Sequence, residues 1–405
     1  MEYLHPSSLP ASKSELSLFT VPPTQVAIDS SYEVEYRPSA SLESSKVHTI
    51  DVPASEDFTD LSQTMVHINL EVHDKDGKKV KTADIKGVEN FGNALFDQVD
   101  FFIGTVNTSQ ATNMYHYQSY IENLLFRHPT KADAGRYDTS NFLKNNVDLY
   151  FRLHLPMCQQ DKLLLNGIPL LFRFTRSREK FPLIHITQDE YTIKITKLAL
   201  HIKRVKLFPD TQTGIISALK ESPAKYFIIR NVVKSFSMNK GVSTVNIENI
   251  FSGILPRRVI VGFVDETAFA GNNYKDPYWF EHANITQISL NVDGNLYPSI
   301  PYQPSFPDNC MREYVNLFRC LGQDEGIPQL DLDYENYKSK KTLFGFDLGG
   351  GLGGETGSLS LIKRGAVRLE LRFAAETTSS YKIIVFGQFD NLITIDKDRI
   401  VTLDY

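Results

Sequence analysis

Four apolar runs in the first part of the chain recur in the same order in the second part, and this repetition constrains the fold most. Each run lies about 190 residues before its counterpart, as expected of one architecture used twice. The paired runs are Gln98–Gly104 with Ser289–Gly294, Tyr150–Leu155 with Leu343–Leu348, Leu170–Phe174 with Leu369–Phe373, and Tyr191–Ile195 with Tyr381–Val385. A helical stretch stands between the first and second run of each set. The pattern predicts two domains of similar structure.

The runs have the periodicity of β-strands. Polar and apolar residues alternate along Tyr150–Leu155, which is typical of a strand with one buried face. Pro156 ends this strand. Asn166–Gly167 is a turn-forming pair between the apolar runs Leu163–Leu165 and Pro169–Phe174, and it predicts a β-hairpin.

Strands outnumber helices in the rest of the chain. Further strands are predicted at Tyr32–Tyr36, Val47–Val52, Met65–His73, Val99–Ile103, Leu183–Phe208 (with Leu198–Leu207 as the second of two), Tyr226–Met238, Arg258–Phe263, Ile285–Val292, Ser358–Ile362, Ala366–Phe373, Tyr381–Phe386 and Leu392–Leu403. Helices are predicted at Thr112–Phe126, Thr213–Glu221 and Asp308–Leu321, the last after a segment with Pro298, Pro301, Pro304 and Pro307.

The absence of strand–helix–strand alternation favours an all-β fold: two tandem antiparallel eight-stranded jelly rolls with short inserted helices. Two immunoglobulin-like sandwiches are the alternative, but the inserted helices and long connections exceed what that compact domain carries. We expect an N-terminal arm over residues 1–30, a first jelly roll over 31–208, a linker with a short helix over 209–224 and a second jelly roll over 225–405. Each domain is long enough to bury about 70% of its unfolded surface.

Composition limits the class of protein further. Three cysteines, Cys158, Cys310 and Cys320, form neither a disulfide framework nor metal-type spacing, so a reducing compartment is expected. The N-terminus lacks a signal-peptide pattern, and no run of about 18 apolar residues could span a membrane. The formal net charge of -5 gives no electrostatic footprint for general nucleic-acid binding.

Several local patterns resemble chemical sites but fit them poorly. Residues 349–354 match a dinucleotide-binding glycine pattern, yet a turn and strand follow where the phosphate needs a helix N-terminus, so we interpret them as a loop. Asp331–Glu335 begins like a calcium loop but lacks its glycine and its closing glutamate, which favours an acidic solvated loop. His67, Glu71 and His73 share a strand face, but a strand spaces them too far apart for one metal.

No catalytic constellation stands out, and we predict that the chain is not an enzyme, with no catalytic, cofactor or metal residues. Cys158, near His154, is the one nucleophile candidate, and an inactive packed thiol is the simpler interpretation. A basic run could contact nucleic acid, although alternation with apolar residues is typical of a solvated sheet face. It comprises Lys197, His201, Lys203, Arg204 and Lys206.

Ordered similarity over roughly residues 25–405 adds a family. The segments Phe151–Leu155, Gln160–Gly167 and Leu171–Phe174 resemble the double jelly-roll major capsid proteins of the Polinton/Maverick and adintovirus group, relatives of adenovirus hexon. Further segments that carry the likeness are Ala224–Tyr226, Ile229–Arg230, Ile254–Pro256, Val261–Val264, Val292–Gly294 and Leu403–Tyr405.

The resemblance implies a structural major capsid protein. Three chains would form a pseudo-hexameric capsomer, and capsomers would tile an icosahedral shell. The implied partners are further copies of the chain and a single jelly-roll penton or minor capsid protein, without sequence-specific nucleic-acid binding. The implied location is the virion, after synthesis in the host cytoplasm and with the nucleus as one candidate assembly site.

Three connections are predicted as outer decoration or clasps between subunits: Pro129–Asn146, Asp265–His282 and Gln323–Lys341. The alternative function is a soluble ligand- or glycan-binding jelly-roll module without catalytic activity. It would need an exposed aromatic platform, and the clustered candidates are Tyr274, Tyr278, Trp279 and Phe280. A tandem jelly-roll enzyme, the third class, would need metal ligands or an acid pair.

Overall fold

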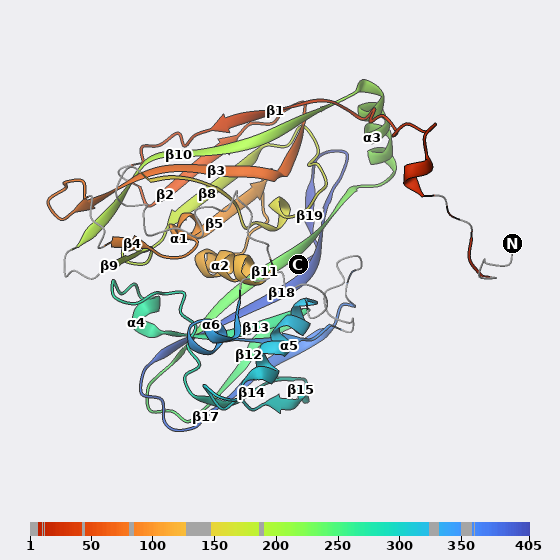
Figure 1. Ribbon diagram of the computed structural model, residues 1–405. Helices are drawn as coiled ribbons and strands as arrows, with labels where there is room; N and C mark the ends of the chain where they lie inside the picture. Colours follow the sequence, from red (N-terminus) through yellow and green to blue (C-terminus); the bar gives the residue numbers. More distant parts are fainter. Residues whose placement is uncertain are drawn as a thin grey trace.

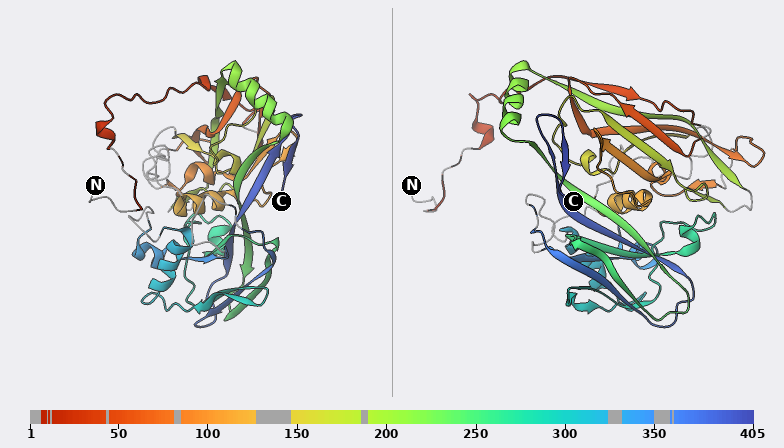
Figure 2. Two further views of the ribbon diagram at one scale, coloured as in Figure 1. Left: turned by 90° about the vertical axis from the view of Figure 1, so that its right-hand side faces the viewer. Right: turned by 180° about the vertical axis from the view of Figure 1, so that it is seen from behind.

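The protein consists of two β-sandwiches that lie against each other, with an arm that extends from the first (Figure 1). The computed structural model describes residues 7–9, 11, 13–42, 45–80, 85–126, 147–185, 190–323, 332–349, 359 and 361–405. The helix α3 (Pro209–Glu221) joins the sandwiches at one end of the molecule, beside the root of the arm (Figures 1 and 2). We refer to residues 28–207 as the first half and to residues 224–405 as the second half.

The first half is built from two four-stranded antiparallel sheets. One sheet has the order β1 (Ile28–Tyr36), β10 (Tyr191–Leu207), β3 (Phe58–Asp74), β7 (Val147–Arg152). The other has the order β2 (Val47–Val52), β8 (Leu170–Arg176), β5 (Phe96–Ile103), β6 (Val106–Asn107). The short strands β4 (Ile85–Gly87) and β9 (Leu183–His185) pair separately.

The second half repeats this arrangement. One sheet has the order β11 (Ala224–Met238), β18 (Tyr381–Ile395), β13 (Arg258–Asp265), β16 (Leu343–Asp347), and β19 (Val401–Leu403) adds to β18. The other has the order β12 (Thr244–Ile254), β17 (Arg364–Phe373), β14 (Ile285–Val292), β15 (Asn295–Tyr302).

The strand orders confirm the internal repetition. The strand orders of the two halves correspond: β1-β10-β3-β7 with β11-β18-β13-β16, and β2-β8-β5-β6 with β12-β17-β14-β15. Each repeated apolar run falls on an equivalent pair, namely β5 with β14, β7 with β16, β8 with β17 and β10 with β18. The longer helices also correspond, because α2 (Tyr115–Leu125) precedes β7 and α5 (Met311–Leu321) precedes β16.

The predicted helices exist, with different starts. Both α2 and α5 begin three residues later than predicted, whereas α3 begins four residues earlier, because Pro209 occupies its first turn. Three short helices were not predicted, namely α1 (Phe91–Ala94), α4 (Glu266–Phe269) and α6 (Tyr334–Ser339). Within the described ranges, 3-10 turns lie at Ser14–Leu16 and Pro156–Cys158.

The predicted hairpin around Asn166–Gly167 is wrong. The turn itself is present, with Gly167 at φ +78. However, Leu164 pairs with Thr59, while β8 pairs with β2 and β5. The turn therefore moves the chain from one sheet to the other instead of joining two paired strands.

Other strand predictions need correction. Of the predicted strand Ser358–Ile362, the described residues Leu359, Leu361 and Ile362 are exposed and not in a strand. The predicted strand Leu392–Leu403 is interrupted by a turn between β18 and β19. Sequence periodicity missed β12, which is irregular between Ile247 and Phe251, and β15, an edge strand that tolerates its two prolines.

One sheet is buried on both faces, and it holds the halves together. Along β18, Ile383 and Val385 point into the core of the second sandwich. The alternating residues Ile384 and Phe386 point into a larger core that contains the interior of the first sandwich. We call this buried contact between the halves the seam. One hydrophobic core therefore spans both halves, and a second core lies within the second sandwich.

Candidate functional site

The sequence-predicted chemical candidates are not brought together. Cys158, Cys310 and Cys320 are buried and form no disulfide. Within the described ranges, no group of three or more His, Cys, Asp or Glu side chains could hold a metal ion. In the same part of the chain, no helix is long and apolar enough to cross a membrane.

The suspected zinc residues have separate partners. The Nε2 of His67 donates to Oδ1 of Asp148 at 2.7 Å, while Nε2 of His73 lies 3.1 Å from Oε2 of Glu71. Lys79 also donates to Glu71 at 2.9 Å. Each group thus belongs to a local surface contact of the sheet β1-β10-β3-β7.

Three segments singled out in the sequence lie wholly or partly outside the described residues. They are residues 350–354 of the glycine pattern, the whole connection 129–146 and residues 324–331 of the connection 323–341. The interpretation of Asp331–Glu335 as a solvated loop is wrong for its second part. Asp333 is the N-cap of α6, and its Oδ1 accepts from the backbone N–H of Asn336 at 2.6 Å.

The basic run on β10 is neutralised by β1. Three contacts connect the strands: His201 with Glu33 at 2.8 Å, Lys197 with Glu35 at 3.7 Å and Lys206 with Asp29 at 3.5 Å. The solvated-face interpretation is wrong for Arg204, which is 2% exposed and donates to Oγ1 of Thr59. This surface is therefore a charge-paired strand pair with one buried anchor.

The most distinctive polar group of the molecule lies in the seam. Glu122 of α2 is 2% exposed, and its carboxylate accepts four hydrogen bonds. The donors are Gln118 (2.8 Å), His154 (2.7 Å), Gln159 (2.5 Å) and, from the second half, Asn231 (2.7 Å). Because buried carboxylates are costly unless they are well bonded, this arrangement favours one relative position of the halves.

The network continues into the second half. The Oδ1 of Asn231 accepts from Gln388 at 3.3 Å, and Oε1 of Gln388 accepts from Arg258 at 3.1 Å. Burial lowers the pKa of Arg258, whose guanidinium also lies 5.8 Å from the ring centre of Phe126. A continuous buried chain of polar contacts thus runs from α2 through β11 and β18 to β13.

An aromatic cluster forms a second part of the seam. The rings of Tyr120 in α2 and Tyr278 in the second half stack with centres 4.1 Å apart and an interplanar angle of 5°. Tyr117 donates to the backbone carbonyl of Pro277 at 2.8 Å, and Tyr278 donates to that of His116 at 3.2 Å. Burial raises the pKa of all three tyrosines, so their hydroxyls are donors at neutral pH.

This cluster contradicts the aromatic platform expected of a ligand-binding module. Tyr278 and Phe280 are both 0% exposed, whereas Tyr274 and Trp279 are exposed. Tyr278 and Phe280 are buried, and residues 277 and 278 contact α2, so this part of the connection Asp265–His282 packs between the halves of one chain and is not outer decoration. The prediction of a clasp between subunits stays a prediction.

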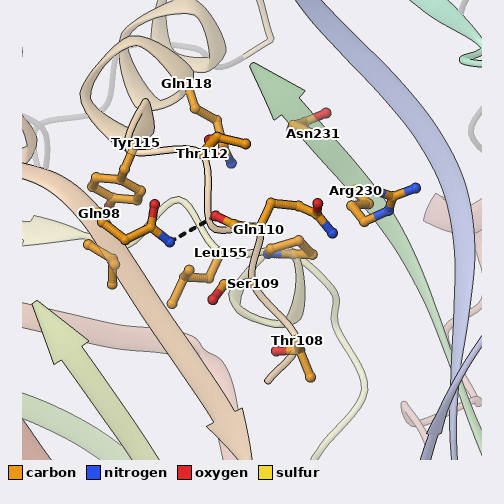
Figure 3. A pocket seen from close by; sticks show the side chains of 12 residues that line it. Gln98, Thr108, Ser109, Gln110, Thr112, Tyr115, Gln118, Leu155, Arg230 and Asn231 are labelled. Atoms are coloured by element: carbon orange, nitrogen blue, oxygen red, sulfur yellow. Dashed lines mark hydrogen bonds between the residues drawn. The ribbon is translucent and has the colours of Figure 1, made fainter. Parts of the chain in front are cut away.

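A small polar pocket opens at the end of the seam (Figure 3). It is partly open to solvent, and Ser109, Gln110, Tyr115 and Arg230 are among its lining residues. Gln98 donates to the backbone carbonyl of Gln110 across it at 2.8 Å. The lining comes from both halves, so the pocket is part of the seam, which residue spacing could not predict.

Known proteins resemble the chain in sequence and, over more of its length, in structure. No family model matches the chain. A curated protein of Caenorhabditis elegans, "Uncharacterized protein F54H12.2", is 21% identical over 333 residues, which are 76% of this chain and 79% of that protein. Structural similarity extends much further than this sequence similarity.

Three solved capsid structures match nearly the whole chain. The PBCV-1 virus capsid protein aligns with a TM-score of 0.64 at 10% identity, over 96% of this chain and 99% of that one. The protein in the Sputnik virophage structure gives 0.62 at 9% identity, over 98% and 93%. The mavirus major capsid protein gives 0.58 at 10% identity, over 99% and 96%.

The chain has a double jelly-roll fold. This confirms the predicted fold class, including the short inserted helices. The eight main strands of each jelly roll provide the sheets, and the seam provides the contact between them. In this double jelly-roll protein the distinctive buried side chains therefore serve packing between domains.

Proposed function

We propose that this double jelly-roll protein is a structural major capsid protein. The observation that carries the proposal is a rigid body of two equivalent jelly rolls, whose fold is shared with viral capsid proteins along almost the entire chain. The buried carboxylate of Glu122 accepts hydrogen bonds from both halves, which suits a building block better than a binding cleft. The proposed role is structural and not enzymatic.

A trimer follows from the repetition. Two equivalent domains per chain let three chains present six similar sides. Most homo-oligomers have closed symmetry, so a closed ring of three chains is expected. We propose that such trimers are pseudo-hexameric capsomers that tile an icosahedral shell. An obligate contact between chains should bury more than about 2,000 Å².

The helices α2 and α5 support this proposal. In α2, ten of eleven residues are buried, because the helix lies against β5 and α1 of its own half and against β11 of the second half. The equivalent helix α5 buries five of eleven, and Met311, Arg312, Val315 and Arg319 are exposed. The outer face of β1-β10-β3-β7 is exposed as well. A second copy could cover both surfaces by repeating the seam between chains.

We propose a Polinton/Maverick-type element as the source, a single jelly-roll penton or minor capsid protein as the partner, and the virion as the location. The arm exposes Leu16, Leu18, Phe19 and Val21, and it would tie neighbouring subunits together. We also propose that the first jelly roll comprises residues 31–208 and the second residues 225–405.

Electron microscopy and sedimentation of the purified full-length chain test the proposal. Hexagonal trimers or closed shells are the expected result. Compact monomers at every concentration would reject it. A variant that lacks residues 1–25 isolates the arm, because unchanged assembly in that variant would remove the arm's role and leave the trimer intact.

A further inference from the structure

Asn166 and Gly167 lie in the turn that carries the chain from one sheet of the first half to the other, and they are the one Asn-Gly pair in the sequence. Such pairs are chemically labile, because glycine has no side chain to keep its backbone nitrogen away from the preceding asparagine. That nitrogen attacks Cγ, expels ammonia and forms a cyclic imide, which water opens to aspartate or isoaspartate. The net reaction consumes water, releases ammonia and needs no other reactant.

In the folded chain, hydrogen bonds hold the groups that would react. The backbone N–H of Gly167 donates to the carbonyl of Ser55 at 2.7 Å, and this proton is the one that the attacking nitrogen must lose. The side-chain amide of Asn166 donates to the carbonyl of Glu56 at 3.0 Å. The attacking nitrogen and the leaving amide group are therefore both engaged elsewhere.

The second half adds a further restraint through Arg399, in the turn between β18 and β19. Its Nη2 donates to Oδ1 of Asn166 at 2.7 Å, and its Nε donates to the backbone carbonyl of the same residue at 2.7 Å. A planar guanidinium that donates two hydrogen bonds to one residue fixes the position and the orientation of that residue. We call these two bonds the Arg399 clasp. They immobilise the side-chain carbonyl that the reaction must reach.

The turn holds Arg399 in an unusual backbone conformation. Its φ of +66 lies in the left-handed region, which residues with a Cβ seldom adopt. Oδ1 of Asp396 accepts from the backbone N–H groups of Asp398 and Ile400, both at 2.9 Å, and these bonds organise the turn. Such a conformation persists only where the surroundings determine it. The hydrogen bonds to Asn166 are contacts that this conformation provides.

Further contacts hold the same segment of the first half to the second half. The hydroxyl of Tyr226 in β11 donates to the carbonyl of Leu163 at 3.1 Å and accepts from the backbone N–H of Leu165 at 3.2 Å. Lys162 donates to the carbonyl of Lys225 at 2.9 Å. The segment therefore stays fixed as long as the two halves are in contact.

We infer that Asn166 is a self-modification site that the Arg399 clasp keeps closed. A chain whose halves are in contact retains the amide, and a chain whose halves part converts it to aspartate or isoaspartate. The isoaspartate product adds one atom to the backbone directly before Gly167 and displaces Ile168, which is 3% exposed. The reaction thus permanently marks chains that have opened. The inference concerns a single chain and does not depend on assembly.

Mass spectrometry of the full-length chain tests the inference. The chain is incubated at mildly alkaline pH, either folded or in urea, and the digested peptide that contains residue 166 is followed by its conversion from amide to acid. Labelling by an isoaspartyl methyltransferase detects the isoaspartate product. We expect the folded chain to convert Asn166 at least about tenfold more slowly than the chain in urea, since local opening must precede the reaction.

The variant Arg399→Ala separates the clasp from the rest of the fold. It should convert Asn166 at least about tenfold faster than the unaltered folded chain, because two hydrogen bonds from a charged donor are lost. Lys397→Ala, at an exposed position of the same turn, is the matched control and should react like the unaltered chain. Gly262→Ala disturbs close packing in the second half but leaves the clasp intact, so it should also react like the unaltered chain. Circular dichroism checks that each variant is folded.

Equal rates in the folded chain and in urea would overturn the inference. An unchanged rate in Arg399→Ala would do the same, and so would a slower one, because the guanidinium would then activate the side-chain carbonyl of Asn166. Equal acceleration in Arg399→Ala and Gly262→Ala would also overturn it, since the rate would then follow stability alone. If Arg399→Ala does not fold, Arg399→Lys replaces it, because lysine keeps the charge without the planar donor pair, and a faster reaction is again expected.

Discussion

Asn231 of β11 donates a hydrogen bond of 2.7 Å to Oε1 of Glu122 of α2, inside the seam between the two jelly rolls. The residues are 109 positions apart, and both are at most 5% exposed. Neither jelly roll alone could satisfy this carboxylate completely. The bond therefore links the fold of each half to the position of the other.

Replacing Glu122 by Ala should destabilise the protein strongly. The substitution leaves buried donors on His154, Gln159 and Asn231 without their acceptor, and loss of one partner of a buried charged group costs about 3–5 kcal/mol. Urea unfolding followed by circular dichroism measures the change. Glu376→Ala, at an exposed position, is the control and should change stability by less than about 0.5 kcal/mol. Equal stabilities of the two variants would contradict the role of the network.

Replacing Tyr278 by Ala should also be costly, because it removes a fully buried ring from the aromatic cluster. Truncation of large buried aromatic side chains costs about 3–5 kcal/mol. The adjacent Trp279 is 43% exposed, so Trp279→Ala should cost far less. Thermal unfolding of both variants measures the difference. Similar losses would mean that the ring of Tyr278 is not a seam contact, and would restore the platform interpretation.

Two glycines should respond in opposite ways to substitution by alanine, because one is closely packed and the other has open space around it. A Cβ on Gly262 of β13 would lie 2.4 Å from Cδ1 of Phe280 and 2.7 Å from Cδ2 of Leu343, so Gly262→Ala should destabilise by about 1–3 kcal/mol. Gly214 in α3 has open space around its Cα, and Gly214→Ala should stabilise by about 0.5–1 kcal/mol. Denaturant midpoints of the two variants should therefore move in opposite directions. Midpoints that move the same way would contradict this packing.

The sequence predicts the sheets well where strands are regular. The alternation of Met65–His73 identifies the C-terminal half of β3, and the repetition pairs β5, β7, β8 and β10 with their counterparts in the second half. It fails for β12, where Asn249 at φ 53 interrupts the alternation, and for β15, where prolines hide an edge strand. Periodicity detects local regularity, and these strands owe their place to their neighbours.

The seam was beyond sequence reasoning for a related reason. Glu122 lies on a helix that the sequence predicts, but a polar residue on a helix indicates a solvent-exposed position unless its buried partner is known. Asn231, Gln388 and Arg258 are distant in sequence and have ordinary strand contexts. The available signal was the density of aromatic residues around Tyr278, which we interpreted as an outward surface. Only the fold shows that α2 covers it.

The buried histidine of α2 predicts how stability depends on pH. Burial lowers the pKa of His116 to about 3, against about 6.5 in an unfolded chain. Between these values the unfolded chain binds the proton and the folded one does not, so stability falls as the pH falls from about 6.5 toward about 3. The contribution is up to about 1.4 kcal/mol per pH unit.

His116→Gln should remove this dependence of the free energy of unfolding on pH, measured by urea unfolding at concentrations too low for association. His73→Gln, a surface control, should retain it. An unchanged slope in His116→Gln would mean that other groups, such as the buried His48, whose pKa burial also lowers, dominate the acid response.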